Sequence, residues 1–348
     1  MLKIEQVNHN NFLFLVFLIF PFLSFAQEED NMPSMKDWES VLTLMQYQPV
    51  IPVSIQGNIT NLMEDKLNRR LRPGTFSFSD SLGKKITLPV RFETRGKTRL
   101  RRCDIAPMGI YFDKKGLKKQ KIKIYPKLKT VLPCFANEMA EDLLFREMLV
   151  YKLYGVVSDF DFKVQPIDIV GLDSVTLDTT HAFPAFFIES DKEFKRRLDM
   201  EELDQFNIQW EDLDPKQAQI TAFFQYMVSN ADWKISHKHN LKFFRKNETS
   251  PLVLVPYDFD FSGLVNAEYA LPNPNYNQKN VRHRIYIGKK NKFVKETIQH
   301  FKNKEAEILK TVEEYPYLSA ESKMDITAFL ATFFKGIKNK KSIRKMFR

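Results

Sequence analysis

Glycine is scarce in this sequence, at 11 of 348 residues, and this excludes collagen-like and glycine-linker architectures. Internal repeats are also missing, so the sequence does not indicate a solenoid or a propeller. Two cysteines are too few to form a structural zinc site on their own. After the N-terminal segment, no apolar run is long enough to cross a membrane.

Aromatic residues, by contrast, are plentiful. The chain contains 31 Phe and 12 Tyr, and 43% of its residues are hydrophobic while 28% are charged. This composition is typical of a soluble globular protein with a large core rather than of a disordered one. The length suits one large domain or two of ordinary size.

Positive charge is concentrated in two regions. The formal net charge is +10, yet residues 91–129 alone contain 14 Lys and Arg against three Asp and Glu. Residues 335–348 contain seven Lys and Arg and no acidic residue. A locally basic protein of this kind is expected to bind an anion or a polyanion.

The N-terminal segment has the features of a secretory signal peptide. Lys3 precedes an apolar run from Phe12 to Phe25, and small residues, Ser24 and Ala26, stand before Gln27. We therefore expect residues 1–26 to be removed near Ala26 and the mature protein to be periplasmic or secreted. An uncleaved anchor is the alternative interpretation. No cysteine follows the predicted cleavage point, which argues against a bacterial lipoprotein.

The basic tail, residues 339–348 with the lysines just before it, could bind an anionic partner in that compartment. Because an exported protein meets little nucleic acid, we expect contact with an anionic lipid or polymer of the envelope and no nucleic-acid partner. A solvated helix end is the plainer alternative.

Cys103 and Cys134 are the only cysteines. In an exported protein a disulfide between them would close a loop of about 30 residues and stabilise the fold by roughly 3 kcal/mol. Two buried thiols are the alternative.

Alternating apolar and polar residues predict strands in the first half of the mature chain. A period of two covers residues 51–92, and the same style continues from Arg91 to Tyr125. Gly96, Gly109 and Gly116 are the expected turns.

Helical spacing begins at Asn137, a favourable N-cap, and Gly155 is the expected end of that helix. A second helix starts where Asp214 caps and Pro215 occupies the first turn. Strands are predicted at Phe162–Ile169, Phe183–Ile188, Leu241–Phe244 and Leu252–Val255, and helices near 292–310 and 321–338.

This order, mostly strands and then mostly helices, predicts an α+β fold with a sheet-rich N-terminal part and a helical C-terminal part. No Gly-, Ser- or Pro-rich linker separates the parts, so we expect one bilobed unit with a hinge near 189–195. The expected segments are 1–26 (signal peptide), 27–85 (N-terminal strands), 86–190 (strands and a helix), 191–338 (helical part with a polar loop) and 339–348 (basic tail).

Five polar residues in the C-terminal part could carry chemistry. Asn230 and Asp232 follow the end of a buried helix, and Asn240 opens the next strand. The paired strand then delivers Asp258 and Asp260 at its end. An oxygen-rich cluster of this kind suits Mg²⁺ held by a few carboxylates together with substrate phosphates.

The pattern resembles the CotH family of secretory, protein-kinase-like proteins, in an uncharacterised exported bacterial branch. That family places an Asp in a loop after a helix, then an Asn, then a Trp/Tyr-Asp-x-Asp at a strand end. The resemblance implies that Asp232 is the catalytic residue and that Asn240 and Asp258 bind the metal. Asp260 is either a second metal ligand or a structural neighbour. A bilobed kinase-like fold and Mg²⁺ or Mn²⁺ with ATP are implied in the same way.

Upstream residues extend the resemblance. The run Arg95-Gly96-Lys97-Thr98-Arg99 is similar to the family's phosphate-loop stretch, which implies nucleotide contacts for Arg95 and Lys97. The family's lysine strand matches Lys121 and Lys123, of which at most one would contact phosphate. A solvated strand face explains the same two lysines.

Two glutamates complete the match. Glu147 lies on the helix after the lysines, as an ion-pairing helix Glu would, although a surface pair with Arg146 is an alternative. Glu189 matches the family's acidic residue at the hinge. The sequence departs from ordinary kinases because the loop from Asp232 to Asn240 is longer and the phosphate loop keeps a single glycine.

Plainer interpretations stay open beside these. Asp232 could cap a helix end, and Asp258 with Asp260 could be an acidic strand end. His237 and His239 could bind zinc, but hydrogen bonding that holds the loop is the favoured role.

The best-supported function is an exported kinase-like phosphoryl transferase that acts on an unknown protein or envelope acceptor. The alternatives are a non-catalytic envelope-binding module with a basic surface and a metal-dependent hydrolase.

Overall fold

The computed structural model describes residues 40–348 except 47–48, 97, 124, 126, 177–178 and 348. These residues belong to one compact unit, Trp38–Arg348. The other unit, Met1–Asp37, contains the predicted signal peptide and lies outside the described residues. Among the described helices, none combines the length and the apolar character needed to cross a bilayer.

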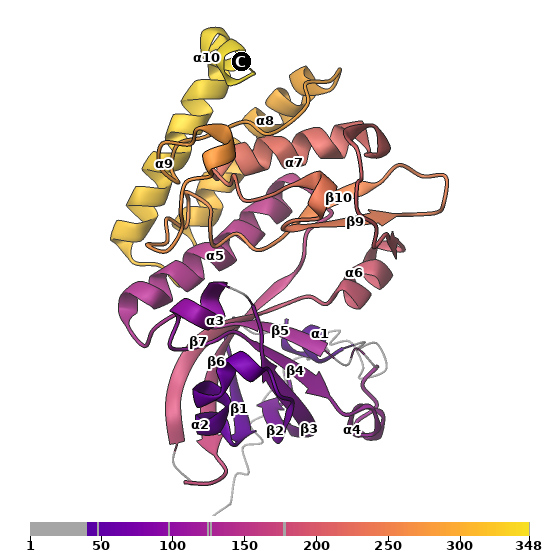
Figure 1. Ribbon diagram of the computed structural model, residues 1–348, viewed down its shortest axis with the longest axis vertical. Helices are drawn as coiled ribbons and strands as arrows, with labels where there is room; N and C mark the ends of the chain where they lie inside the picture. Colours follow the sequence, from indigo (N-terminus) through magenta and orange to yellow (C-terminus); the bar gives the residue numbers. More distant parts are fainter. Residues whose placement is uncertain are drawn as a thin grey trace, which may run out of the picture. The chain divides into compact units, whose positions relative to one another are not determined.

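The N-terminal part is a closed β-barrel with the strand order β1-β2-β3-β4-β5-β7-β6 (Figure 1). Neighbouring strands are antiparallel except for β1 and β6, which pair in parallel and close the barrel. The strands are β1 (Ile51–Gly57), β2 (Arg72–Ser79), β3 (Lys85–Thr94), β4 (Met108–Phe112), β5 (Lys127–Val131), β6 (Val164–Asp173) and β7 (Thr179–Ile188).

Short helices precede the barrel strands or connect them. They are α1 (Val41–Met45), α2 (Ile59–Glu64), the 3₁₀ turn η1 (Lys66–Asn68), α3 (Thr98–Arg102) and α4 (Lys114–Lys119).

The alternation predicted from the sequence fills the barrel. Along β3 every second side chain is buried, from Ile86 through Phe92 to Thr94, because successive strand residues point to opposite faces. The Phe92 ring needs two glycines beside it: a Cβ at Gly57 or Gly74 would lie 2.3 or 2.4 Å from the ring.

The C-terminal part is built from helices around a second core. In Figure 1, α5 (Glu138–Val157) lies between the barrel and the other long helices. The Tyr154 ring on α5 packs edge-on against Phe224 at 4.8 Å, and its hydroxyl lies 2.9 Å from Thr221 Oγ1. The further elements are α6 (Asp191–Leu198), β8 (Glu201–Glu202), η2 (Trp210–Asp212), α7 (Pro215–Met227), η3 (Ile235–His237), β9 (Leu241–Arg245), β10 (Val253–Pro256), η4 (Pro274–Tyr276), α8 (Val294–Glu313), α9 (Ala320–Lys338) and α10 (Lys340–Met346).

Both predicted helix caps are confirmed. Asn137 Oδ1 accepts a hydrogen bond from the Ala140 N–H at 2.9 Å, and Asp214 Oδ1 accepts from the Gln217 N–H at 2.7 Å. The predicted end of α5 is wrong, because the helix continues to Val157.

Gly155 has a packing role instead of ending the helix. A Cβ there would lie 2.8 Å from Asp161 Oδ2, so only glycine allows the following loop to fold back against α5.

The predicted pattern between Arg91 and Tyr125 is also wrong in part. Gly109 lies inside β4, paired with Glu93, and Gly116 lies inside α4. Asp113 caps this helix by accepting from the Gly116 N–H at 2.8 Å, and this local hydrogen bond overrides the alternation.

Consequently Lys121 and Lys123 are not on a strand. Lys121 occupies the turn after α4 with φ of 57°, both side chains are exposed, and the strand begins only at Lys127.

The broad fold prediction is confirmed: a sheet-rich N-terminal part precedes a helical C-terminal part. The closure of the sheet into a barrel was not predicted. It draws β1 and β2, expected as a separate N-terminal segment, into the same sheet as β3–β7.

Candidate active site

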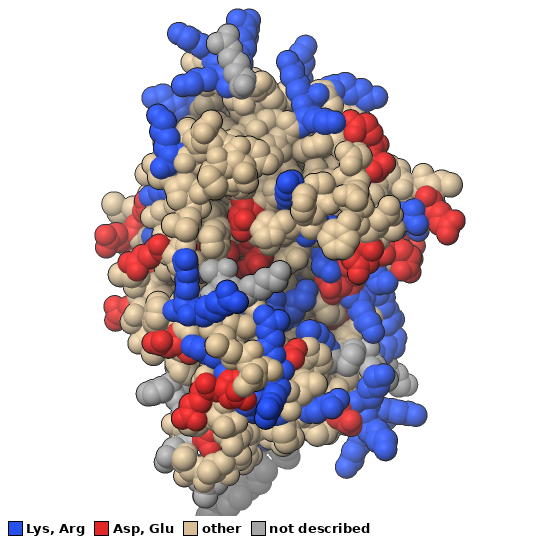
Figure 2. Space-filling view, viewed as in Figure 1, with Lys and Arg blue, Asp and Glu red and all other residues tan. Residues whose placement is uncertain are grey.

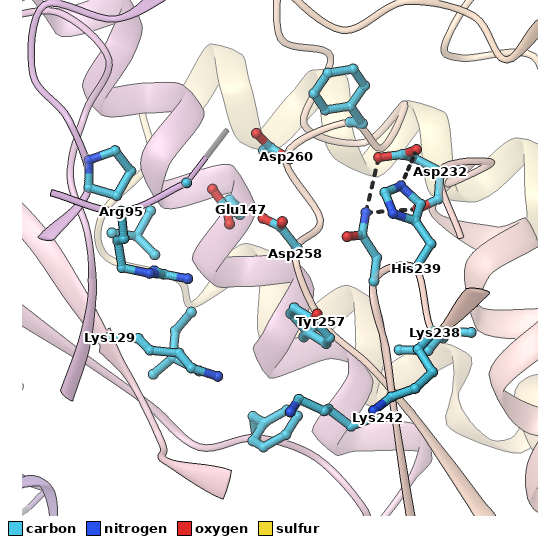
Figure 3. Close-up of a pocket in the computed structure, with 18 of the residues that line it drawn as sticks. Arg95, Lys129, Glu147, Asp232, Lys238, His239, Lys242, Tyr257, Asp258 and Asp260 are labelled. Atoms are coloured by element: carbon cyan, nitrogen blue, oxygen red, sulfur yellow. Dashed lines mark hydrogen bonds and ion pairs between the residues drawn. The ribbon is translucent and has the colours of Figure 1, made fainter. Parts of the chain in front are cut away.

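A cleft of about 730 Å³ is lined by residues of both parts, a volume within the usual range of ligand sites. Figure 2 shows acidic side chains recessed in a hollow near the middle of the visible face. In Figure 3, Arg95 and Lys129 lie on one side of the cleft, Asp232 and His239 lie on the other, and Glu147, Asp258 and Asp260 lie between them.

Asp232 is held in place from three sides. Its own N–H donates to Asn230 Oδ1 at 2.9 Å. His239 Nε2 lies 2.8 Å from one carboxylate oxygen, and Asn240 Nδ2 donates to the other at 3.0 Å and to the Asp232 carbonyl at 2.8 Å. The predicted loop-holding role of His239 is therefore confirmed, and the carboxylate is fixed at the edge of the cleft.

The pairing of β9 with β10 brings Asn240 near Asp258. Leu241 lies opposite Pro256 in this hairpin, and the Tyr257 N–H donates to the Asn240 carbonyl at 3.1 Å. Asp258 therefore follows directly after Tyr257, the residue bonded to Asn240. Helix α5 holds Asp258 there, because the Asp258 N–H donates to the Tyr151 hydroxyl at 2.9 Å.

Left-handed backbone occurs where the chain enters and leaves this hairpin. Asn240 has φ of 53° and Asp258 has φ of 63°. Asn and Asp tolerate this region better than other residues with a side chain, and such conformations cluster at functional sites.

Two buried acids lie at the back of the cleft. Glu147 is 3% exposed, and Asp260 Oδ2 accepts from the Tyr269 hydroxyl at 3.1 Å. Burial raises the pKa of Asp260 to about 7, and the negative charge of Asp258 adds to the shift. Burial also raises the pKa of Glu147, and Asp260 contributes in the same direction.

Arg99 is the cation that faces these acids. Its Nη1 lies 3.5 Å from Glu147 Oε2, and its Nη2 donates to the Leu132 carbonyl. Arg102, on the same helix α3, donates to the Tyr269 carbonyl at 3.1 Å. The alternative that Glu147 pairs with Arg146 on the surface is wrong.

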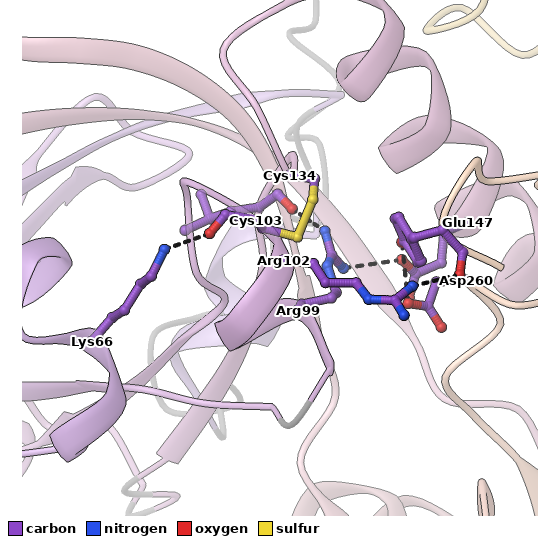
Figure 4. The surroundings of a disulfide bond; sticks show 9 residues. Lys66, Arg99, Arg102, Cys103, Cys134, Glu147 and Asp260 are labelled. Carbon is purple, nitrogen blue, oxygen red and sulfur yellow. Dashed lines mark hydrogen bonds and ion pairs between the residues drawn. A yellow bond between two sulfur atoms is a disulfide. The ribbon is translucent and has the colours of Figure 1, made fainter.

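A disulfide anchors α3 in this position (Figure 4). Cys103 and Cys134 form the predicted bridge, which spans 31 positions of the chain. The Ile105 N–H donates to the Cys134 carbonyl at 3.1 Å, and Lys66 Nζ donates to the Cys103 carbonyl at 2.6 Å. The C-terminal end of the helix that carries Arg99 is therefore tied to η1 and to the segment that follows β5.

Lys129, on β5, was missed by the sequence analysis although it lines the cleft. Its Nζ lies 3.4 Å from Asp191 Oδ1 and 5.7 Å from the centre of the Tyr257 ring. Burial lowers the pKa of Lys129, and the Asp191 carboxylate opposes the shift. The available signal was its place on the last strand before the Asn137 helix.

Asp191 joins Lys129 to a second lysine. Lys242 Nζ lies 3.2 Å from Asp191 Oδ2 and 2.6 Å from Glu202 Oε1. Burial opposes the ionised form of Asp191, but the two lysine charges outweigh it and lower its pKa.

Of the predicted site residues, six line the cleft: Arg95, Glu147, Asp232, Asn240, Asp258 and Asp260. Lys121 and Lys123 do not, because they follow α4 on the outside of the barrel, and Lys97 lies outside the described residues.

Glu189 does not line the cleft and is bonded to neighbouring elements of the fold instead. It is buried, and two of its oxygens accept from Arg197 at 2.8 Å each while one also accepts from the Lys163 N–H at 3.1 Å. These bonds tie the end of β7 to α6 and to the start of β6.

The donor set suits a hard cation that is bound together with phosphates. Both Asn240 amide hydrogens are directed to Asp232, which leaves Asn240 Oδ1 as an acceptor. The exposed Asp258 carboxylate has no hydrogen-bond partner among the described residues. No group of three His, Cys, Asp or Glu side chains in the described part could hold a metal, but a nucleotide-bound Mg²⁺ needs only one or two carboxylates.

Comparisons with known proteins assign no family. No protein-family model matches the chain, and no curated protein matches it. Among solved structures, it is similar to a crystal structure of the Helicobacter pylori proinflammatory kinase CtkA, with 8% identity, 72% of this chain and 94% of that chain covered, and a TM-score of 0.40. A likeness this distant assigns neither fold nor activity, so the resemblance to the CotH family stays a prediction.

Proposed function

We propose that this protein is an exported, bilobed kinase-like phosphoryl transferase that uses ATP with Mg²⁺ or Mn²⁺. The observation that carries the proposal is the arrangement of one cleft, in which Arg95 and Lys129 face Asp232 and Asp258. Cations on one wall and oxygen donors on the other fit a nucleotide polyphosphate with its metal.

Each side chain has a role in this proposal. Asp258 and Asn240 Oδ1 would hold the metal, which supplies charge neutralisation when it is bound. Asp232 would accept the proton of the acceptor hydroxyl, since His239 and Asn240 fix its carboxylate at the edge of the cleft. Arg95 and Lys129 would bind the phosphates as fixed positive charges.

The ion pairs differ from those of ordinary kinases. Kinases pair a strand lysine with a helix glutamate. Here Glu147 is paired with Arg99, and the strand lysine Lys129 is paired with Asp191. We infer that Asp191 orients Lys129 while Arg99 compensates the buried acids.

Transfer of the γ-phosphoryl group to a hydroxyl tests this function. The purified mature protein is assayed for ADP formation with Mg²⁺ and Mn²⁺, with and without envelope extracts as the source of the acceptor. Asp232→Asn should abolish transfer, and Asp159→Asn, at an exposed aspartate, is the matched control and should keep it. Equal rates in both variants would contradict the assignment of Asp232.

A second candidate function rests on the outer surface. The lysines on α4 and in the following turn are exposed, and Figure 2 shows basic side chains gathered there and around α10. A non-catalytic protein could use these surfaces to bind an anionic polymer or lipid of the envelope. The exposed lysines of this surface are Lys114, Lys115, Lys118, Lys119, Lys121 and Lys123. This candidate predicts that the protein binds polyphosphate, that this binding weakens steeply as salt is added, and that Mg-ATP does not stabilise the protein.

A further inference from the structure

Two smaller hollows continue outward from the cleft at Asp232. The first, of about 540 Å³, shares Asp232, His237 and His239 with the cleft. The second, of about 230 Å³, shares Trp233, Lys234 and Tyr276 with the first. Shared walls make them one continuous surface, which we call the outer groove. It runs from Asp232 past Trp233 and Tyr276 to Trp210, Gln209 and Ser236.

The side chains of the outer groove are mostly aromatic or uncharged and polar. Beyond Asp232 at its inner end, Lys234 is the only formally charged residue among the described residues that line it. A groove for a basic or an acidic peptide would carry several charges of the opposite sign. This one carries amides, a phenol and a hydroxyl, which both donate and accept hydrogen bonds, and two indoles, which only donate.

Two indole rings form its floor. Trp210 and Trp233 pack edge to face with their centres 6.2 Å apart. Trp233 is 2% exposed, and its Nε1 is a buried donor that has no hydrogen-bond partner in the described part of the chain. A ligand oxygen would satisfy this buried donor only where binding shifts the ring or the atoms that cover it.

The outer wall is fixed to the loop that carries Asp232. Asn273 Nδ2 donates to the Ala231 carbonyl at 2.7 Å, and Asn273 Oδ1 accepts from the Asn275 N–H at 3.0 Å. The Asn273 N–H donates to Gln278 Oε1 at 2.9 Å. These bonds hold Tyr276, at the end of η4, beside the candidate catalytic residue.

We propose that the outer groove binds the phosphoryl acceptor and that the acceptor is a neutral saccharide chain; this rests on the proposed function. A sugar ring offers C–H faces to aromatic rings and hydroxyls to amides, which is the chemistry of this lining. One hydroxyl would reach Asp232, and the next units of the chain would lie along Tyr276 and Trp210.

The transfer step balances without further reactants. The sugar hydroxyl oxygen bonds to the γ-phosphorus of ATP, and its proton passes to the Asp232 carboxylate. The bond from the γ-phosphorus to its bridging oxygen breaks, and ADP leaves with that electron pair.

Tryptophan fluorescence tests the groove directly, because two of the chain's three tryptophans line it. Trp38, which lies outside the described residues, is replaced by Phe to remove its emission. Maltohexaose, chitohexaose and xylohexaose are titrated at millimolar concentrations, with an uncharged Ser- and Thr-containing hexapeptide as the competing acceptor class. We expect at least one saccharide to change the emission and the peptide to leave it unchanged.

Tyr276 supplies the matched variants. Tyr276→Ala should weaken saccharide binding about tenfold, and Tyr276→Phe, which keeps the ring, should bind nearly as wild type. A response to the peptide alone, no response to any saccharide, or wild-type affinity in Tyr276→Ala would overturn the proposal.

Nucleotide binding separates this proposal from the proposed function. Thermal stabilisation by Mg-ATP should be the same in wild type and Tyr276→Ala. If Mg-ATP stabilises neither protein while a saccharide still binds, the kinase-like function fails and so does the acceptor role, but the saccharide site stands. If Mg-ATP binds and no saccharide does, only the groove proposal fails.

Discussion

The Arg99 guanidinium lies 3.5 Å from the Glu147 carboxylate at the back of the cleft. Both side chains are largely buried, and the charges of Asp258 and Asp260 act on each of them. The cation comes from the short helix α3, which a disulfide ties to the barrel, rather than from a strand of the sheet. The disulfide therefore helps to hold the positive charge of Arg99 beside the buried acids of the site.

Loss of Arg99 should destabilise the protein strongly. Arg99→Met leaves the acids at the back of the cleft without their counter-charge, and removal of one partner of a buried pair typically costs about 3–5 kcal/mol. Urea unfolding at neutral pH measures this. Arg99→Lys, which keeps the charge, is the control and should lose less. Unchanged stability in Arg99→Met would show that the pair is not buried as described.

Stability should fall as the pH rises toward neutrality. The pKa of Asp260 in the folded state, about 7, is above its unfolded value, so the folded state binds more protons between about pH 4 and 7. The stabilisation by protonation is present at low pH and is lost as pH passes through 7. Asp260→Asn should remove this part of the pH dependence in a series of unfolding curves. A wild-type slope in the variant would place the titration on another group.

The disulfide should contribute roughly 3–4 kcal/mol, as its loop of 31 positions implies. The free energy of unfolding of the double variant Cys103→Ala, Cys134→Ala, measured in urea, should be lower by that amount. The position of Arg99 should also be less well fixed in this variant. Dithiothreitol should lower the wild-type midpoint and leave the double variant unaffected. A reductant effect of equal size on both proteins would contradict this.

Lys129, not Lys121, should contribute to nucleotide binding. Lys129→Ala should weaken Mg-ATP binding about tenfold or more, because a charge-assisted contact is lost. Lys121→Ala removes the same charge from the outside of the barrel and is the matched control. Calorimetric titration distinguishes them, and equal losses would show that net charge rather than contact matters.

Local signals were predictable from the sequence, and long-range ones were not. The caps Asn137 and Asp214 bond to residues three positions away, so their sequence context was sufficient. The prediction of a turn at Gly116 was wrong because the need for glycine there comes from a distant residue. A Cβ at Gly116 would lie 2.8 Å from a ring atom of Pro89, which is 27 positions earlier in the chain. The parallel pairing of β1 with β6, which closes the barrel, joins segments too far apart for any local pattern to predict.

The candidate site divides in the same way. Asp232, Asn240 and Asp258 were found because a helix end and a hairpin deliver them in a fixed order along the chain. The Arg99–Glu147 pair was missed because α3 was read as part of a phosphate loop. Lys129 was missed because alternation at Lys121–Lys123 resembled a strand that a helix cap at Asp113 prevents.

Calorimetric titration of Mg-ATP into the purified protein tests the central claim most directly. The account predicts metal-dependent binding to wild type, loss of that binding in Asp258→Asn, and retention in Asp232→Asn, which should lose only phosphoryl transfer. Absence of binding to wild type, or equal binding to all three proteins, would contradict a nucleotide site in this cleft.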